Sequence, residues 1–166
     1  MFTLKRISKE SIPEALQKAE RYRLLNEPRL AESICQDILA VEQDNHDAII
    51  SMILSITEQF GKYTSVDINK PFQLIPLLTS EYERYYFSGI ISERRGMDVL
   101  SRDLTGAHFT AYEWLADAMA DYEKAEAIRP PNNDDALLRW NTCARIIMLN
   151  HLKPRDEERS PEQPLE

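Results

Sequence analysis

Histidine, cysteine and acidic side chains are the groups of this chain that could bind a metal ion or act in acid–base catalysis. Its three histidines, His46, His108 and His151, lie far apart, and no His-x-x-x-His or Cys-x-x-Cys spacing occurs. A glycine-rich phosphate-binding loop is also missing from a sequence that contains only 4 glycines. We therefore expect no catalytic activity, no metal and no cofactor.

A metal-dependent enzyme is the least favoured alternative. It would use the adjacent acids Asp134 and Asp135 together with Glu93 and His108 in a site of unrecognised type. Neighbouring acids at the start of a helix ordinarily interact with the helix dipole. The sequence therefore favours a binding protein, and stoichiometric metal in the purified protein would reverse that preference.

The charge balance restricts the possible partners. The 166-residue chain has 28 acidic and 20 basic residues, a net charge of −8, whereas nucleic-acid binding usually requires a concentrated basic face. Its apolar runs are too short to span a bilayer, so we expect neither a nucleic-acid nor a membrane partner. No apolar segment follows the basic N-terminal residues, and Cys35 and Cys143 lie within apolar helical patterns. We expect buried thiols and a cytoplasmic location.

Apolar residues recur at three- and four-residue intervals through most of the chain, which predicts an all-α fold. Ser80 and Glu83 have the spacing of a capping box, and Pro130 ends the helix before it. We expect one domain over residues 1–152 and a disordered, proline-containing acidic tail over residues 153–166. The predicted helices cover about residues 12–25, 30–39, 46–60, 71–78, 80–100, 111–128 and 135–150.

The window of residues 12–45 has the length and spacing of a helix pair. Its first helix has the small Ala19 and, three residues later, the aromatic Tyr22. Its second helix has Ala31 and, four residues later, Cys35. Small residues at such positions let two helices approach closely. In this pattern the window resembles one unit of the tetratricopeptide repeat family.

The C-terminal half is similar to the same family. Ala118, Tyr122, Ala125 and Pro130 reproduce the spacing of the family's second helix, including the proline that ends a unit. The resemblance implies a tetratricopeptide-like α-solenoid of about three irregular helix pairs and a C-terminal capping helix. A non-repetitive helical bundle is the alternative. The pattern leaves open whether residues 61–79 complete the middle repeat.

In such a solenoid the first helices of the pairs line a concave surface that binds another protein or a peptide. Arginine and asparagine there could bind a peptide's backbone or carboxylates, and tyrosine adds contact area. We therefore expect a scaffold or adaptor; the structural alternative is a helical protein that forms a homodimer through an exposed apolar helix edge. By their position in the repeat, the groove residues that the resemblance implies are Glu20, Arg23, Tyr86, Glu93, Arg94, Asn141 and Arg145.

Overall fold

The computed structural model describes residues 1–155, so most of the predicted tail, from residue 156 onward, lies outside the described residues. Within this range the secondary structure is helical and contains no strand, which confirms the all-α prediction. The α-helices are α1 (Ile12–Leu24), α2 (Pro28–Val41), α3 (His46–Thr57), α4 (Lys70–Leu74), α5 (Glu81–Ser101), α6 (Ala107–Ala127) and α7 (Asp135–Leu149), with the 3-10 helices η1 (Lys9–Ser11) and η2 (Ile75–Leu77).

Local sequence accounts for several helix ends. The Ser80 hydroxyl accepts a hydrogen bond from the backbone N–H of Glu83 at 3.3 Å, which confirms the predicted start of α5. Asn26 ends α1 with a left-handed φ of 62°, and the N–H of Glu27 donates to the carbonyl of Tyr22 at 2.8 Å. This pattern is a Schellman motif, in which asparagine takes the position that glycine usually occupies.

Three predicted boundaries are wrong, each for a local reason. The third helix ends at Thr57, before Gly61 turns the chain with a φ of 76°. Residues 71–78 form α4 and then η2, because Pro76 has no N–H for the α-helical hydrogen bond. The helix predicted over residues 111–128 begins at Ala107, four residues earlier than expected, directly after Gly106 with a φ of 78°.

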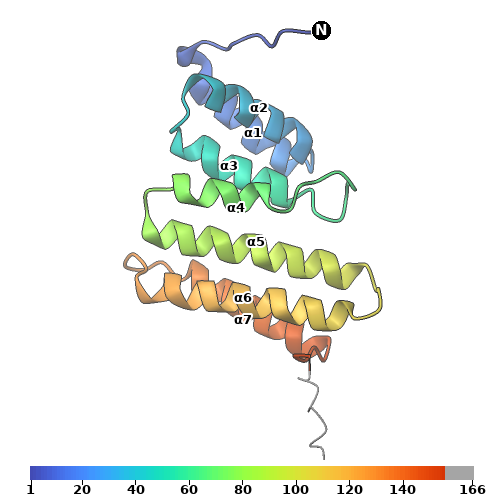
Figure 1. Ribbon diagram of the computed structural model, residues 1–166. Helices are drawn as coiled ribbons and strands as arrows, with labels where there is room; N and C mark the ends of the chain where they lie inside the picture. Colours follow the sequence, from blue (N-terminus) through green and yellow to red (C-terminus); the bar gives the residue numbers. More distant parts are fainter. Residues whose placement is uncertain (156–166) are drawn as a thin grey trace, which may run out of the picture.

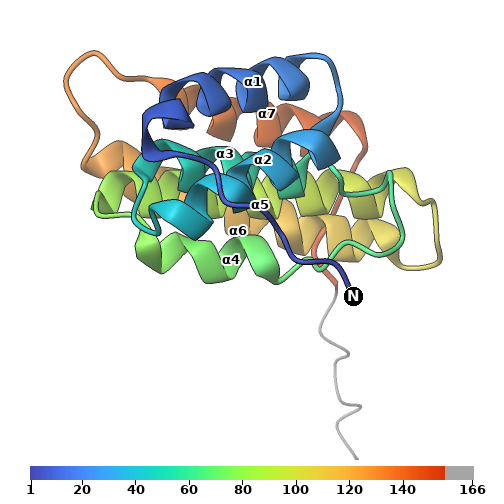
Figure 2. The ribbon, with the colours of Figure 1, turned by 90° about the horizontal axis from the view of Figure 1, so that it is seen from above.

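The helices stack in chain order, from α1 at one end of the molecule to α6 and α7 at the other (Figure 1). The most extensive packing joins α5 to α6, and α1 with α2, α2 with α3, and α6 with α7 form the next largest contacts. Seen along the stack, α1 and α7 lie on one side and α4 and α6 on the other (Figure 2). Hollows lie between α1 and α3 and between α5 and α7, and we call the side of the stack that they mark the open side of α1, α3, α5 and α7.

Small residues permit the close helix contacts. Ala19, Ala31 and Cys35 are fully buried together between α1, α2 and α3. On α5, a Cβ atom added to Gly89 would lie 2.5 Å from Cε1 of Tyr122, so this glycine lets the fully buried aromatic ring of α6 pack against the helix backbone. The small and aromatic residues noted in the sequence thus lie at helix–helix contacts.

Candidate binding surface

Glu58, at the end of α3, joins α1 to α5. Arg23 on α1 donates to Oε1 of Glu58 through Nη2 at 2.6 Å, and its Nε lies 3.1 Å from both carboxylate oxygens. Nη1 of Arg94 on α5 lies 3.7 Å from Oε1 of the same carboxylate and donates to Oγ1 of Thr57 at 2.6 Å and to the carbonyl of Leu54 at 3.1 Å. Two predicted groove residues therefore meet through a carboxylate that the sequence analysis missed.

Glu93 is buried, in contrast to its predicted place on an open groove. Its Oε2 accepts a hydrogen bond from the hydroxyl of Tyr122 on α6 at 2.5 Å, and its Oε1 accepts from Nη1 of Arg139 on α7 at 3.0 Å. Residues 93 and 94 are consecutive on a helix and point about 100° apart. Because Arg94 points toward α3, Glu93 points toward α6 and α7 instead.

The Glu93 cluster changes the acidity of the groups around it. Burial and the nearby carboxylate raise the pKa of Tyr122, and burial followed by Glu93 raises the pKa of Cys143 to about 12. Burial opposes protonation of Arg139, but the charge of Glu93 raises the pKa of that guanidinium overall. The tyrosine and the thiol therefore stay neutral, while the carboxylate is paired with Arg139.

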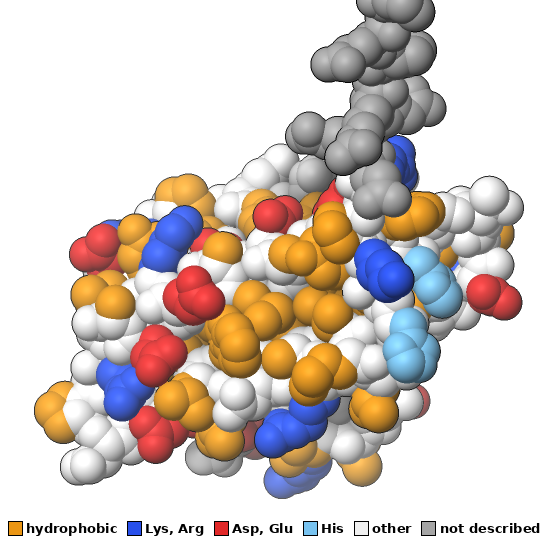
Figure 3. All heavy atoms as spheres, turned by 90° about the horizontal axis from the view of Figure 1, so that it is seen from below, with side chains coloured by type: hydrophobic (Ala, Val, Ile, Leu, Met, Phe, Trp, Pro, Cys, Tyr) orange, Lys and Arg blue, Asp and Glu red, His pale blue; other side chains and the backbone are white. Residues whose placement is uncertain are grey.

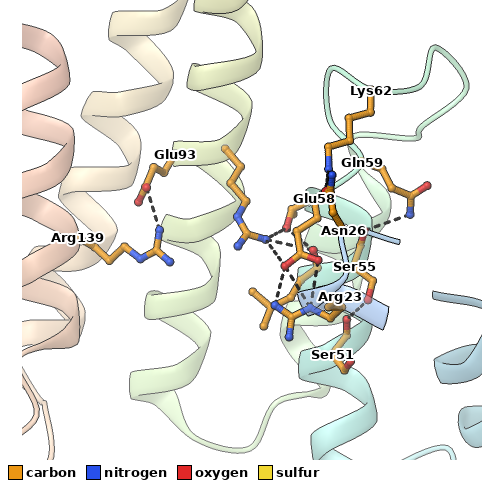
Figure 4. A network of polar contacts seen from close by, with 12 residues as sticks. Arg23, Asn26, Ser51, Ser55, Glu58, Gln59, Lys62, Glu93 and Arg139 are labelled. Atoms are coloured by element: carbon orange, nitrogen blue, oxygen red, sulfur yellow. Dashed lines mark hydrogen bonds and ion pairs between the residues drawn. The ribbon is translucent and has the colours of Figure 1, made fainter. Parts of the chain in front are cut away.

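Three arginines, Arg23, Arg94 and Arg139, form what we call the arginine row across α1, α5 and α7. Burial lowers the pKa of Arg94; the charge of Glu58 opposes this effect, and the charges of Arg139 and Arg23 add to it. Glu58 and Glu93 are the two carboxylates that pair with the row. Figure 4 shows Arg23 with Glu58 and Arg139 with Glu93 on the two sides of α5. The row itself has three cations and two paired carboxylates, and the acids Glu20, Asp47 and Asp135 lie beside it.

Two hollows flank the arginine row. The first, of about 260 Å³, lies between α1 and α3 and is lined by Glu20 and Arg23 among others. The second, of about 210 Å³, lies between α5 and α7 and is lined by Tyr86 and Arg139. The remaining lining residues are Leu16, Gln17, Asp47, Ile50 and Ser51 in the first hollow and Asp135, Leu138 and Thr142 in the second.

The two predicted groove residues of α7, Asn141 and Arg145, line neither hollow. Leu138, Arg139 and Thr142 line the second hollow from α7, whereas Arg145 follows Leu138 by seven residues and lies about two turns further along the same side of the helix. Arg139 takes the place expected for them. The groove positions were assigned from the small residues of the repeat pattern, and no small residue of α7 indicated that Arg139 faces this surface. The arginine side chain by itself did not indicate it either.

The structure brings no metal site together in the part of the chain that it describes. Of the acids and histidine considered above, Glu93 is buried in the core, whereas His108 is exposed at the start of α6 and Asp134 is exposed before α7. Residues 1–155 contain no group of three or more histidine, cysteine, aspartate or glutamate side chains that could hold a metal ion. Among the described helices, none has the length and apolar character needed to cross a membrane.

The chain was also compared with known proteins. No family model, no curated protein and no solved structure matches it. The family resemblance in the helix spacing is therefore a hypothesis, and function has to be inferred from the packing and the charges of this chain.

Proposed function

We propose that this chain is a scaffold that binds another protein or a peptide on the open side of α1, α3, α5 and α7, without catalysis. We interpret α1 with α2, α3 with α4, and α5 with α6 as three irregular helix pairs of a tetratricopeptide-like α-solenoid, with α7 as its terminal helix. The stacking order and the buried small residues Ala19, Ala31 and Gly89 support this interpretation. The short α4 makes the middle pair irregular.

The arginine row is the observation that carries the proposal. Its side chains are partly open to solvent, at 21% for Arg23, 23% for Arg94 and 35% for Arg139. The row has three cations for two paired carboxylates, and the hollows on its two sides are lined by the acids Glu20, Asp47 and Asp135. An extended segment that places an acidic side chain against the row, between these two hollows, fits this distribution of charge and space.

The row is also held in place before any ligand binds. Glu58 accepts from Arg23, and Thr57 and the Leu54 carbonyl accept from Arg94, so these long side chains have already lost much of their freedom. Ordering a free side chain at an interface costs about 0.5–1.5 kcal/mol, and a side chain that is already ordered avoids most of that cost. The same contacts that join α1, α3 and α5 therefore also lower the entropic cost of recognition.

We also propose a cytoplasmic location. Both Cys35 and Cys143 are free and buried. Unpaired buried thiols are typical of proteins that fold in a reducing compartment.

A peptide array tests the proposed function. The labelled protein is applied to sets of 12-residue peptides whose central residues are acidic, neutral or basic and whose flanking residues are random. We expect binding to concentrate on the acidic set and to fall about tenfold in Arg23→Gln/Arg139→Gln, because two charged contacts in the binding surface are lost. Arg21→Gln is the matched control, since Arg21 is an exposed arginine on α1 that lines neither hollow.

Thermal unfolding by circular dichroism separates lost binding from lost folding in these variants. Acidic peptides bound equally well by the double variant would contradict the role of the arginine row. Binding no stronger than that of heat-unfolded protein, for all three peptide sets, would contradict the proposed function itself.

A further inference from the structure

The end of the stack formed by α6 and α7 has an apolar outer surface. Figure 3 views the molecule from this end, and hydrophobic side chains gather over its centre. Helical-repeat proteins normally close their ends with a polar outer face, which keeps the terminal unit soluble. We call this surface the terminal face and define it by the half-buried Tyr112 and Met119 of α6 and by Leu137, Trp140, Ala144 and the exposed Met148 of α7.

The helix α7 has apolar residues on two sides, and the protein's own packing uses only one of them. Ala136 and Cys143 are buried against the rest of the stack. Leu137 follows Ala136 and Ala144 follows Cys143, so each lies about 100° further around the helix than its buried neighbour. Met148 continues this second stripe and is 64% exposed. A helix that is apolar on two sides is typical of one with neighbours on both sides.

The charges around the terminal face are unequal at its two ends. The start of α6 lies beside the chain that follows α7, because the guanidinium of Arg155 lies 5.9 Å from the ring centre of Phe109. Basic residues and histidines therefore gather at this end, which we call the basic rim. Its members are His108, His151, Lys153 and Arg155.

The other end, where α6 ends and α7 begins, is the acidic rim. Its members are Glu123, Glu126 and Asp134. The arginine at this end, Arg129, is already paired with Glu126 at 3.0 Å and with Asp134 at 3.6 Å. Figure 3 shows the histidines and a basic side chain at one side of the apolar centre, and acidic side chains with some basic ones among them at the opposite side.

We propose that a second copy of this chain covers the terminal face. The twofold axis lies in the plane of the face, midway between the two rims and parallel to them. Rotation about this axis places the acidic rim of each copy on the basic rim of the other. The surface is therefore complementary to itself in charge as well as apolar at its centre. Without that pairing, two chains with a net charge of −8 each would repel one another.

The size of the face predicts a weak dimer. The helix α7 has 15 residues and is about 22 Å long, and two adjacent helices are about 20 Å wide. The contact therefore buries on the order of 450 Å² per copy, or about 900 Å² in total, which is below the roughly 1,000 Å² that stable specific interfaces exceed. We expect a dimer that dissociates in the micromolar range.

Sedimentation equilibrium of the full chain between about 5 and 300 μM tests the proposal. We expect the wild-type protein to pass from the 19.3 kDa monomer to a dimer with rising concentration. Met148→Glu and Lys153→Glu/Arg155→Glu should each weaken the dimer at least tenfold, by placing a charge in the apolar centre or reversing the basic rim. Leu24→Glu is the matched control, because Leu24 is 82% exposed at the far end of the stack and should leave the dimer unchanged.

Several outcomes would overturn the proposal. One is a wild-type protein that stays monomeric at 300 μM, and another is a Met148→Glu variant that dimerises like the wild type with an unchanged thermal unfolding curve. Loss of the dimer in Leu24→Glu would place the interface elsewhere. A dimer that forms only after residues 156–166 are deleted would assign the terminal face to the chain's own C-terminal segment.

Discussion

Gly89 provides a direct test of the close packing between α5 and α6. In Gly89→Ala, the added methyl group would lie 2.5 Å from Cε1, 2.7 Å from Cδ1 and 2.9 Å from Cζ of the Tyr122 ring. Real Cβ atoms essentially never approach other atoms so closely, so something must move. The ring is fully buried and its hydroxyl donates to Glu93 at 2.5 Å, which leaves separation of the two helices as the main relief.

The magnitude follows from three contributions. Overpacking a core costs about 1–3 kcal/mol, and a weakened hydrogen bond to the buried carboxylate costs about a further 1–2 kcal/mol. Alanine in place of glycine within a helix stabilises the folded protein by about 1 kcal/mol. We therefore expect the free energy of unfolding to fall by about 2–3 kcal/mol, which lowers the unfolding midpoint of a chain of this size by about 5–10 °C.

Gly96→Ala is the matched control, because it is the same substitution in the same helix. There the nearest atoms to the added methyl group would be Cγ of Leu115 at 3.0 Å and Cβ of Trp114 at 3.2 Å, contacts that a few tenths of an ångström would relieve. Thermal and urea unfolding, followed by circular dichroism, measure both variants. A Gly89→Ala protein as stable as the wild type, or no less stable than Gly96→Ala, would refute the packing described for α5 and α6.

Two further predictions concern titratable groups. His46 hydrogen-bonds Glu83 at 2.8 Å, and this contact, with a smaller effect of Asp47, raises the pKa of the histidine. This contact therefore stabilises the folded protein fully below the pKa that His46 has in the unfolded chain, and its contribution is lost as the pH rises through the pKa of His46 in the folded protein. For this half-exposed pair the contribution is about 0.5 kcal/mol or less. Urea unfolding between pH 5 and 8 should show this decline in wild-type protein but not in His46→Gln, and equal slopes would contradict it. Burial raises the pKa of both Cys35 and Cys143. A thiol-specific reagent at pH 8 should therefore label the native protein far more slowly than the urea-unfolded protein. Rapid labelling of the native protein would contradict the burial of these thiols.

The helices were largely predictable because their signals are local. Apolar periodicity and the cap at Ser80 depend on residues within a few positions of one another. The prediction failed where a single residue set the backbone, as at Gly106 before α6 and Pro76 within the segment of α4 and η2. The left-handed φ of Gly106 allows an abrupt entry into the helix, and the sequence alone does not distinguish it from a glycine in an open loop.

The candidate binding surface was predictable only in part. Glu20, Arg23 and Tyr86 line the two hollows, and Arg94 lies between them, but Glu93 was expected on the same surface and is buried. Glu58 and Arg139 were missed because a carboxylate at a helix end and an arginine in a terminal helix are common in solvent-exposed positions, and the sequence does not show their partners. Their roles depend on contacts between residues that are 35 and 46 positions apart in the chain.

By itself, the amino-acid sequence determined that this chain is helical, roughly where each helix begins and ends, and which small and aromatic residues pack between helices. The tertiary structure decided which charges pair, which carboxylate is buried, and that α7 keeps a second apolar side uncovered. The physical reason is the separation in sequence over which each effect acts. Backbone hydrogen bonding and helical periodicity act over a single turn. The burial of a charge or an apolar stripe depends instead on which distant helix is packed against it.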